Sequence, residues 1–332
     1  MNNKPLACIF LVVFIAITIL YVKSPKYTSK KIVALFQEYS LTYDIDEKSV
    51  NEEIDITETP LSLDTCETLI NKINYFIQNK KPIVLTMVGF PYKSSNTKDK
   101  VLASVADGAE RYSLVYIHTF LEKIKNVYAP GAQLFIFTDG IAFCDIEKIQ
   151  DKIVLEYEDS LKKLVYNLPC IKIITMRDLC PDKSPEEIRT LILSMNPSAE
   201  SFYELLNSDK KLQNDVAVLT QRLAFELALL SLTQKEMTDI GLKETQRSLQ
   251  YSNFLKQFRP EETITCSVHY QKNPNRKIGL KLSDSYVTPW HGVLVEADGN
   301  FRIEHLKNID LTTYKKRSHN INGIECVYLK KQ

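Results

Sequence analysis

Polar side chains with the chemistry to bind or catalyse follow three apolar runs of this sequence. Lys93, Ser94 and Ser95 come after the run IVLTMVGF, Asp139 comes after LFIFT, and Arg177 comes after IKIITM. A lysine with hydroxyl groups in one loop supplies charge and hydrogen-bond donors together, which suits a phosphate or a carboxylate. The alternative for the first loop is that its side chains are polar without binding a ligand. The alternative for Asp139, which precedes a glycine, is that it forms a turn.

Two of the five histidines are candidates for acid-base chemistry, because imidazole changes its charge near neutral pH. His269 ends a predicted strand, and His291 follows Trp290, the only tryptophan of the chain. His118 falls within an amphipathic helical pattern, which favours a structural role.

Arg222 lies one helical turn before Glu226 in an apolar helical segment. An internal ion pair explains this spacing. Equally, Arg222 has the planar donor group that binds a substrate carboxylate.

Several common function classes are excluded by motifs that the chain lacks. It has no GxGxxG, no GxxxxGK[ST] and no GxSxG, and no HExxH or other close group of His, Asp and Glu predicts a metal site. The seven cysteines form no CxxC pair, which argues against disulfides or zinc and favours a reducing compartment. A net charge of +1 without long runs of one sign argues against nucleic acid as a partner.

The elements that must position these side chains alternate between strand and helix. Strands are predicted over KPIVLTMV (81–88), within APGAQLFIFTDG (129–140) between two turns, and in IKIITMRDL (171–179), separated by helices that include 107–128. This order predicts an α/β fold with a largely parallel sheet and helices on both faces, in which ligands bind beyond the carboxyl ends of the strands. A mainly helical insertion over 181–258 follows. Short strand candidates follow it, in the segments TITCSVHY, KIGLKL, HGVLVEA, FRIEHL and IECVYL, and predict C-terminal antiparallel hairpins.

The amino-terminal part is predicted to lie outside this fold. Residues 6–22 carry no charge and reach about the minimum length of a membrane span, so residues 1–23 are interpreted as a single-pass anchor rather than a signal peptide. More lysines follow this segment than precede it, which predicts that the folded domain lies on the cytoplasmic side of the membrane. Residues 24–60 are interpreted as a polar tether with one short helix, and residues 61–332 as the folded domain.

Several blocks of the sequence occur together in the order seen in the isocyanide synthase family. They are FPYKSSNTKDKVLASVADGAE, APGA before LFIFTDG with FCDI after it, SVHYQKNPNRKIGLKL and TPWHGV. The resemblance covers residues 69–306, and FPYKS and TPWHGV are its most specific parts. The family includes the pyoverdine/paerucumarin-type synthases and the yeast enzyme of dityrosine biosynthesis.

The resemblance implies a Rossmann-like enzyme of secondary-metabolite biosynthesis that acts on an aromatic L-amino acid, usually tyrosine or tryptophan. The amino nitrogen would acquire one carbon from ribulose 5-phosphate and become an isocyanide, with no metal or redox cofactor. The yeast relative leads instead to an N-formyl tyrosine. A tailoring enzyme dependent on iron and 2-oxoglutarate would be a separate chain.

This chemistry needs groups that bind the phosphate and carboxylate of the substrates and at least one group that transfers protons. The matching positions comprise proton-transfer candidates, cationic or hydroxyl groups for phosphate or carboxylate, and an aromatic wall. The proton-transfer candidates are His291, His269 and Asp139. The candidates for binding phosphate or carboxylate are Lys93, Ser94, Ser95, Arg177 and Lys277, and Trp290 is the aromatic residue expected to line the pocket. Arg222 is a further candidate for substrate binding, although its helix matches the family only loosely.

Two other classes stay open. A membrane-tethered glycosyltransferase has the same order of anchor, stem and α/β domain, but the only DxD sequence, residues 44–46, falls in the tether. A noncatalytic module that binds a sugar phosphate or an amino acid would hold its ligand without consuming it.

Overall fold

A parallel sheet of five strands forms the centre of the protein. The computed structural model describes residues 24–40, 61–227, 230–268 and 277–332. The sheet has the order β3-β2-β1-β4-β5, and every neighbouring pair is parallel. Its strands are β1 (Ile83–Val88), β2 (Ala132–Phe137), β3 (Ile171–Ile174), β4 (Ile264–Ser267) and β5 (Ile278–Gly279).

The first half of the sheet is connected through helices that the sequence predicts. Helix α4 (Gly108–Val127) joins β1 to β2, and α6 (Asp151–Leu164) joins β2 to β3. Two short helices, α5 (Gly140–Phe143) and α7 (Met176–Leu179), begin directly beyond β2 and β3. The α/β fold with a parallel sheet is therefore confirmed.

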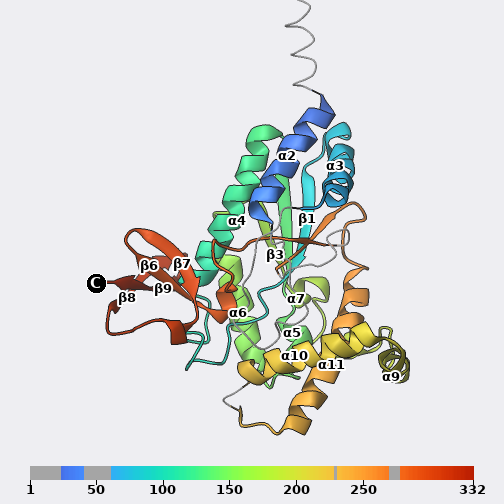
Figure 1. The fold of residues 1–332 in the computed structure, drawn as a ribbon, viewed down its shortest axis with the longest axis vertical. Helices are drawn as coiled ribbons and strands as arrows, with labels where there is room; N and C mark the ends of the chain where they lie inside the picture. Colours follow the sequence, from blue (N-terminus) through green and yellow to red (C-terminus); the bar gives the residue numbers. More distant parts are fainter. Residues whose placement is uncertain (1–23, 41–60, 228–229, 269–276) are drawn as a thin grey trace, which may run out of the picture.

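The predicted helical insertion is also present. It consists of α8 (Pro185–Leu193), α9 (Ala199–Ser208), α10 (Lys210–Glu226) and α11 (Gln234–Leu255). In Figure 1, α10 and α11 lie below the sheet, on the side of α5 and α7 and thus of the carboxyl ends of the strands. After the insertion, β4 returns the chain to the sheet beside β1, and β5 pairs with β4.

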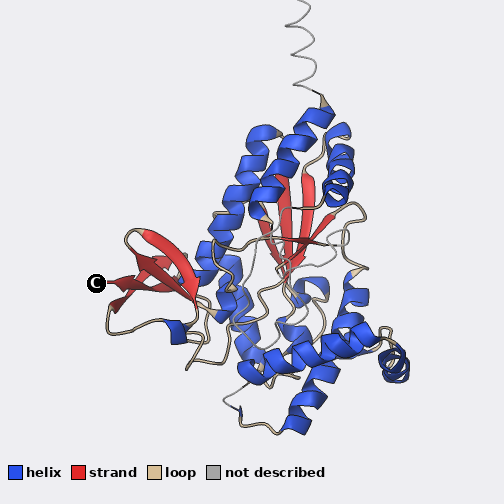
Figure 2. Ribbon diagram, in the orientation of Figure 1, coloured by secondary structure: helices blue, strands red, loops and turns tan. Residues whose placement is uncertain are grey.

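The C-terminal strands differ in two respects from the prediction of antiparallel hairpins. TITCSVHY and KIGLKL contribute β4 and β5 to the parallel sheet, while β6 (Val293–Ala297), β7 (Asn300–Glu304), β8 (Tyr314–Ile321) and β9 (Ile324–Lys331) form a second, mixed sheet. In that sheet β6 pairs with β7 and β8 with β9 antiparallel, but β6 and β9 are parallel. Figure 2 shows this small sheet set apart from the central one.

The amino-terminal segment supplies a helix to the folded body. Helix α2 (Pro25–Tyr39) packs on α3 (Leu63–Gln78) and α4 and buries Ile32, Val33 and Phe36. The Phe36 ring meets Phe120 of α4 edge to face at 5.1 Å. The short helix expected within the tether is thus part of the core.

The predicted membrane anchor is corrected here. No helix among residues 24–40, 61–227, 230–268 and 277–332 is long and apolar enough to cross a bilayer. The first described helix, α2, instead buries its apolar face in the protein. The anchor segment itself, residues 1–23, lies outside the described residues. The transmembrane helix and the single-pass membrane localisation derived from it are therefore withdrawn.

Candidate active site at the carboxyl ends of the parallel strands

Lys93 lies in the loop after β1, and its side chain is completely buried. Its Nζ donates to Asp107 Oδ1 at 3.0 Å, to both oxygens of Glu110 at 3.0 and 3.1 Å, and to the carbonyl oxygen of Pro289 at 2.8 Å. Asp107 and Glu110 form the capping box at the start of α4. Lys93 therefore joins the β1 loop, the first turn of α4 and the TPWHGV segment, and its ammonium group is fully engaged in these contacts.

The cluster around Lys93 holds two carboxylates against one ammonium group. Burial raises the pKa of the Glu110 carboxyl, and the nearby Lys93 opposes that rise. The Tyr157 hydroxyl also donates to Glu110 Oε1 at 3.1 Å. Each buried charge thus has polar partners, as a low-dielectric interior requires.

The TPWHGV segment packs against the same loop. Pro289–His291 forms one turn of 3-10 helix, and the Trp290 side chain is 3% exposed and contacts the Phe90 ring at 5.0 Å. Its carbonyl oxygen accepts a hydrogen bond from the Ser94 amide at 2.9 Å. Gly89 allows this approach, since a Cβ there would lie 3.4 Å from the indole and 3.0 Å from Val268. Trp290 is therefore a buried anchor of the loop.

His291 is oriented by its own turn. Its Nδ1 lies 3.0 Å from Thr288 Oγ1, and its carbonyl oxygen lies 2.9 Å from Nδ1 of His305. A carbonyl only accepts, so His305 carries its proton on Nδ1 in this contact. The His291 side chain is partly exposed, unlike Trp290 beside it.

Asp139 lies two residues beyond the end of β2. Its Oδ1 is enclosed and has no hydrogen-bond partner among the described residues. Burial, together with the charge of Glu158, raises the pKa of Asp139 to about 7. A carboxyl group with that pKa can both donate and accept a proton near neutral pH.

The β1 and β2 loops meet closely beside Asp139. A Cβ on Gly140 would collide with the carbonyl oxygen of Pro91, so only glycine permits this packing. Tyr92, the next residue, is buried, and the charge of Asp139 contributes to raising its pKa well above its usual value, after burial and Glu147. The FPYKS and FTDG blocks thus form one wall at the carboxyl ends of β1 and β2.

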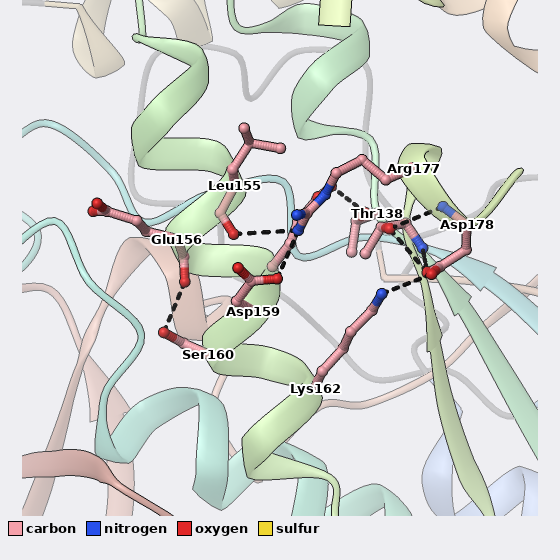
Figure 3. Close-up of polar contacts among 10 residues, drawn as sticks. Thr138, Leu155, Glu156, Asp159, Ser160, Lys162, Arg177 and Asp178 are labelled. Atoms are coloured by element: carbon pink, nitrogen blue, oxygen red, sulfur yellow. Dashed lines mark hydrogen bonds and ion pairs between the residues drawn. The ribbon is translucent and has the colours of Figure 1, made fainter. Parts of the chain in front are cut away.

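Arg177, beyond β3, is tied to helix α6. Figure 3 shows its guanidinium directed at that helix, where Nη2 donates to Asp159 Oδ1 at 2.7 Å and to the Leu155 carbonyl at 3.5 Å. Glu158 Oε2 also lies 3.5 Å away. With carboxylates already around it, Arg177 acts as a link between α7 and α6 in this structure.

A second cationic position lies near β5. Burial, and then the charge of Arg259, lowers the pKa of Lys277 just before that strand. Burial also lowers the pKa of Arg259, and its Nε is enclosed without a hydrogen-bond partner among the described residues. Arg259 interacts electrostatically with Tyr251, whose hydroxyl donates to the carbonyl of Thr138, the residue before Asp139. Arg259 is therefore close enough to interact electrostatically with both Lys277 and Tyr251.

The remaining predicted residues are only partly placed. Ser94 is buried, and its Oγ accepts from the Asn96 amide at 3.1 Å, whereas Ser95 is partly exposed. His269 lies outside the described residues. Arg222 lies on α10, but its side chain is likewise not described.

Sequence reasoning missed the residues that surround Asp139 from distant parts of the chain. Tyr92 stands within the FPYKS block and could have been singled out there. Tyr251 and Arg259 come from the end of the helical insertion, which carries no motif. Only the folded chain brings the Tyr251 hydroxyl to the Thr138 carbonyl, beside Asp139, and Arg259 close to Tyr251.

Most of the chain is similar to known proteins. The family model described as "Pyoverdine/dityrosine biosynthesis protein" matches residues 73–317. An L-tyrosine isonitrile synthase of Xenorhabdus nematophila is 26% identical over 283 residues, which cover 79% of this chain and 82% of the relative. An L-tryptophan isonitrile synthase of Fischerella ambigua is 29% identical over 252 residues, covering 72% and 78% respectively.

A crystal structure shares the fold. The PvcA protein of Pseudomonas aeruginosa superposes with a TM-score of 0.75 at 23% sequence identity, over 92% of this chain and 100% of the other.

Proposed function

Because the chain belongs to the pyoverdine/dityrosine biosynthesis protein family, we propose that it is an isocyanide synthase. Its substrate is an aromatic L-amino acid, tyrosine or tryptophan, whose amino group becomes the isocyanide. Ribulose 5-phosphate supplies the added carbon. The observation that carries the proposal is the match, over most of both chains, to relatives named as tyrosine and tryptophan isonitrile synthases.

Asp139 supports the proposal because the reaction moves protons. Condensation of an amine with a ketose requires proton transfer to and from nitrogen and oxygen, and so does the later carbon-carbon cleavage. With a pKa of about 7, the Asp139 carboxyl serves as donor or acceptor at neutral pH. We assign it proton transfer, together with His291, and with His269 from the family motif.

Arg259 and Lys277 support the use of a phosphorylated donor. Their positive charges repel one another, and an anion bound between them relieves that repulsion. Lys93 was the first candidate for this role, but its ammonium group is held by Asp107 and Glu110. We therefore assign the phosphate to Arg259 and Lys277, and to Lys93 the positioning of the loop.

The test is to incubate the purified chain with ribulose 5-phosphate and either tyrosine or tryptophan, and to analyse the products by mass spectrometry. An isocyanide product carries one more carbon and two fewer hydrogens than the amino acid, and carbon-13 in the sugar phosphate must appear in it. The Asp139→Asn variant is the matched control for background chemistry.

Each outcome has a separate meaning. Labelled isocyanide from one amino acid supports the proposal and identifies the substrate. A labelled formamide places the chain with dityrosine biosynthesis, the other activity in the family description. Folded protein that binds both substrates and consumes neither contradicts the proposal and favours a noncatalytic binding module.

A further inference from the structure

Three side chains with metal-binding atoms meet at the end of the sheet opposite Asp139. His118 and Glu122 are one turn apart on α4, and Cys170 directly precedes β3. One ligand atom of each residue lies within 4.8 Å of the other two. Cys170 is 48 residues beyond Glu122 in the chain, so sequence spacing did not reveal the group.

Two contacts indicate that the group is already organised. Cys170 Sγ lies 3.3 Å from Glu122 Oε1, and Leu134 of β2 holds the Cys170 backbone through a hydrogen bond of 2.8 Å. His118 Nδ1 is enclosed and has no hydrogen-bond partner among the described residues. A buried ring nitrogen without a partner is costly, and a ligand that it binds would offset that cost.

The donor atoms fit a tetrahedral divalent ion. Thiolate, imidazole and carboxylate are the ligands of Zn²⁺, with bonds of about 2.0–2.3 Å that place neighbouring ligand atoms roughly 3.3–3.8 Å apart. The sulfur and the Glu122 oxygen already have that separation, at 3.3 Å, and the His118 nitrogen lies within 4.8 Å of both. Thiolate and carboxylate together neutralise the ion.

Two local effects oppose each other at Cys170. Burial and the adjacent Glu122 raise the pKa of its thiol, while the charge of Lys125 lowers it. An ion that binds here must displace the thiol proton, so its affinity increases with pH. Lys125 weakens the attraction for any cation, which favours an ion that bonds strongly to sulfur over Mg²⁺ or Ca²⁺.

We propose that His118, Glu122 and Cys170 form a binding site for Zn²⁺ that links α4 to the start of β3, with water as the fourth ligand. The site lies beyond the amino ends of β2 and β3, whereas Asp139 lies beyond the carboxyl end of β2. It is independent of isocyanide synthesis and is tested without an activity measurement.

The experiment uses Co²⁺ as a spectroscopic probe on the purified full chain after removal of metal with a chelator. One equivalent should produce the near-ultraviolet charge-transfer band of a thiolate-cobalt bond and the visible bands of tetrahedral Co²⁺, and Zn²⁺ should abolish both by competition. Cys170→Ser should remove the charge-transfer band. It should also weaken Zn²⁺ binding by more than about 100-fold, since even an outer-shell partner is worth roughly 10–100-fold.

Two further variants show whether the bound metal ion depends on these particular side chains. Cys66→Ser changes another partly buried free cysteine and should leave the titration unchanged. Glu122→Gln retains the shape of the side chain but removes its charge, and should lower Zn²⁺ affinity at least tenfold with an unchanged circular dichroism spectrum. The proposal is overturned if the original chain gives no thiolate-cobalt band, or if the band and the affinity survive both Cys170→Ser and Glu122→Gln.

Discussion

Replacement of Lys93 by methionine tests whether this lysine binds a ligand or holds the fold. Methionine fills a similar volume but removes the ammonium group from Asp107, Glu110 and the Pro289 carbonyl. Removing one partner of a buried ion pair typically costs about 3–5 kcal/mol, because the remaining charges stay buried without compensation. That cost is a large part of a usual net stability of about 5–15 kcal/mol.

The assay is equilibrium unfolding in urea, followed by circular dichroism. Lys93→Met should lower the free energy of unfolding by about 3–5 kcal/mol. Lys98→Met, the same change at an exposed lysine of the same loop, should alter it by less than about 0.5 kcal/mol. Adding Glu110→Gln to Lys93→Met should restore part of the loss, because glutamine at this position has no charge to bury or to neutralise on folding.

The pH dependence of this defect has a defined sign. Lys93 opposes the rise in the pKa of Glu110 that burial causes, so Lys93→Met raises that pKa further above its unfolded value. A carboxyl with a raised folded pKa stabilises the fold at low pH and loses that contribution as the pH rises through it. Because the pKa of Glu110 is already raised to about 8 with Lys93 present, the deficit of Lys93→Met should be smaller at pH 6 than at pH 9. Unchanged stability at both pH values, with a raised KM for ribulose 5-phosphate, would refute the structural role and restore Lys93 as a ligand.

Three further predictions concern the proposed reaction. Asp139→Asn should lower kcat by roughly 10²–10⁴-fold, and in the original chain the kinetic titration of Asp139 should appear near pH 7; a variant of normal activity excludes proton transfer by this residue. Arg259→Met and Lys277→Met should each raise KM for ribulose 5-phosphate at least tenfold while changing KM for the amino acid little, and equal effects on both substrates would remove the phosphate assignment. His291→Ala should abolish turnover, yet unfold at the same urea concentration as the original chain; full activity would contradict its role.

The sequence alone determined the parts of the fold whose signals are local. The apolar runs within 81–88, 129–140 and 171–179 indicate buried strands, and the helices that alternate with them predict a parallel sheet. Asp139 could be placed at a strand end for the same reason. The order of the FPYKS and TPWHGV blocks likewise identified the family without any knowledge of contacts.

Elements without a local signal were missed or misassigned. Strand β8 reads YKKRSHNI, and its side chains are largely exposed on both faces, so no alternation of polar and apolar residues marks it. KIGLKL was expected in a hairpin, but its β5 pairs with β4 in the parallel sheet. Periodicity indicates a strand without specifying its partner, because pairing depends on segments far apart in the chain.

The tertiary structure alone decided what each polar side chain contacts. Lys93 meets Pro289 across 196 residues, and that contact changes an apparent ligand-binding lysine into a buried structural one. Arg259 comes close to Tyr251 and Lys277 only because the chain returns from the helical insertion to the central sheet. Residue type and local pattern specify what a side chain can do, but burial and the charges of distant neighbours determine which protonation state and which partner it has.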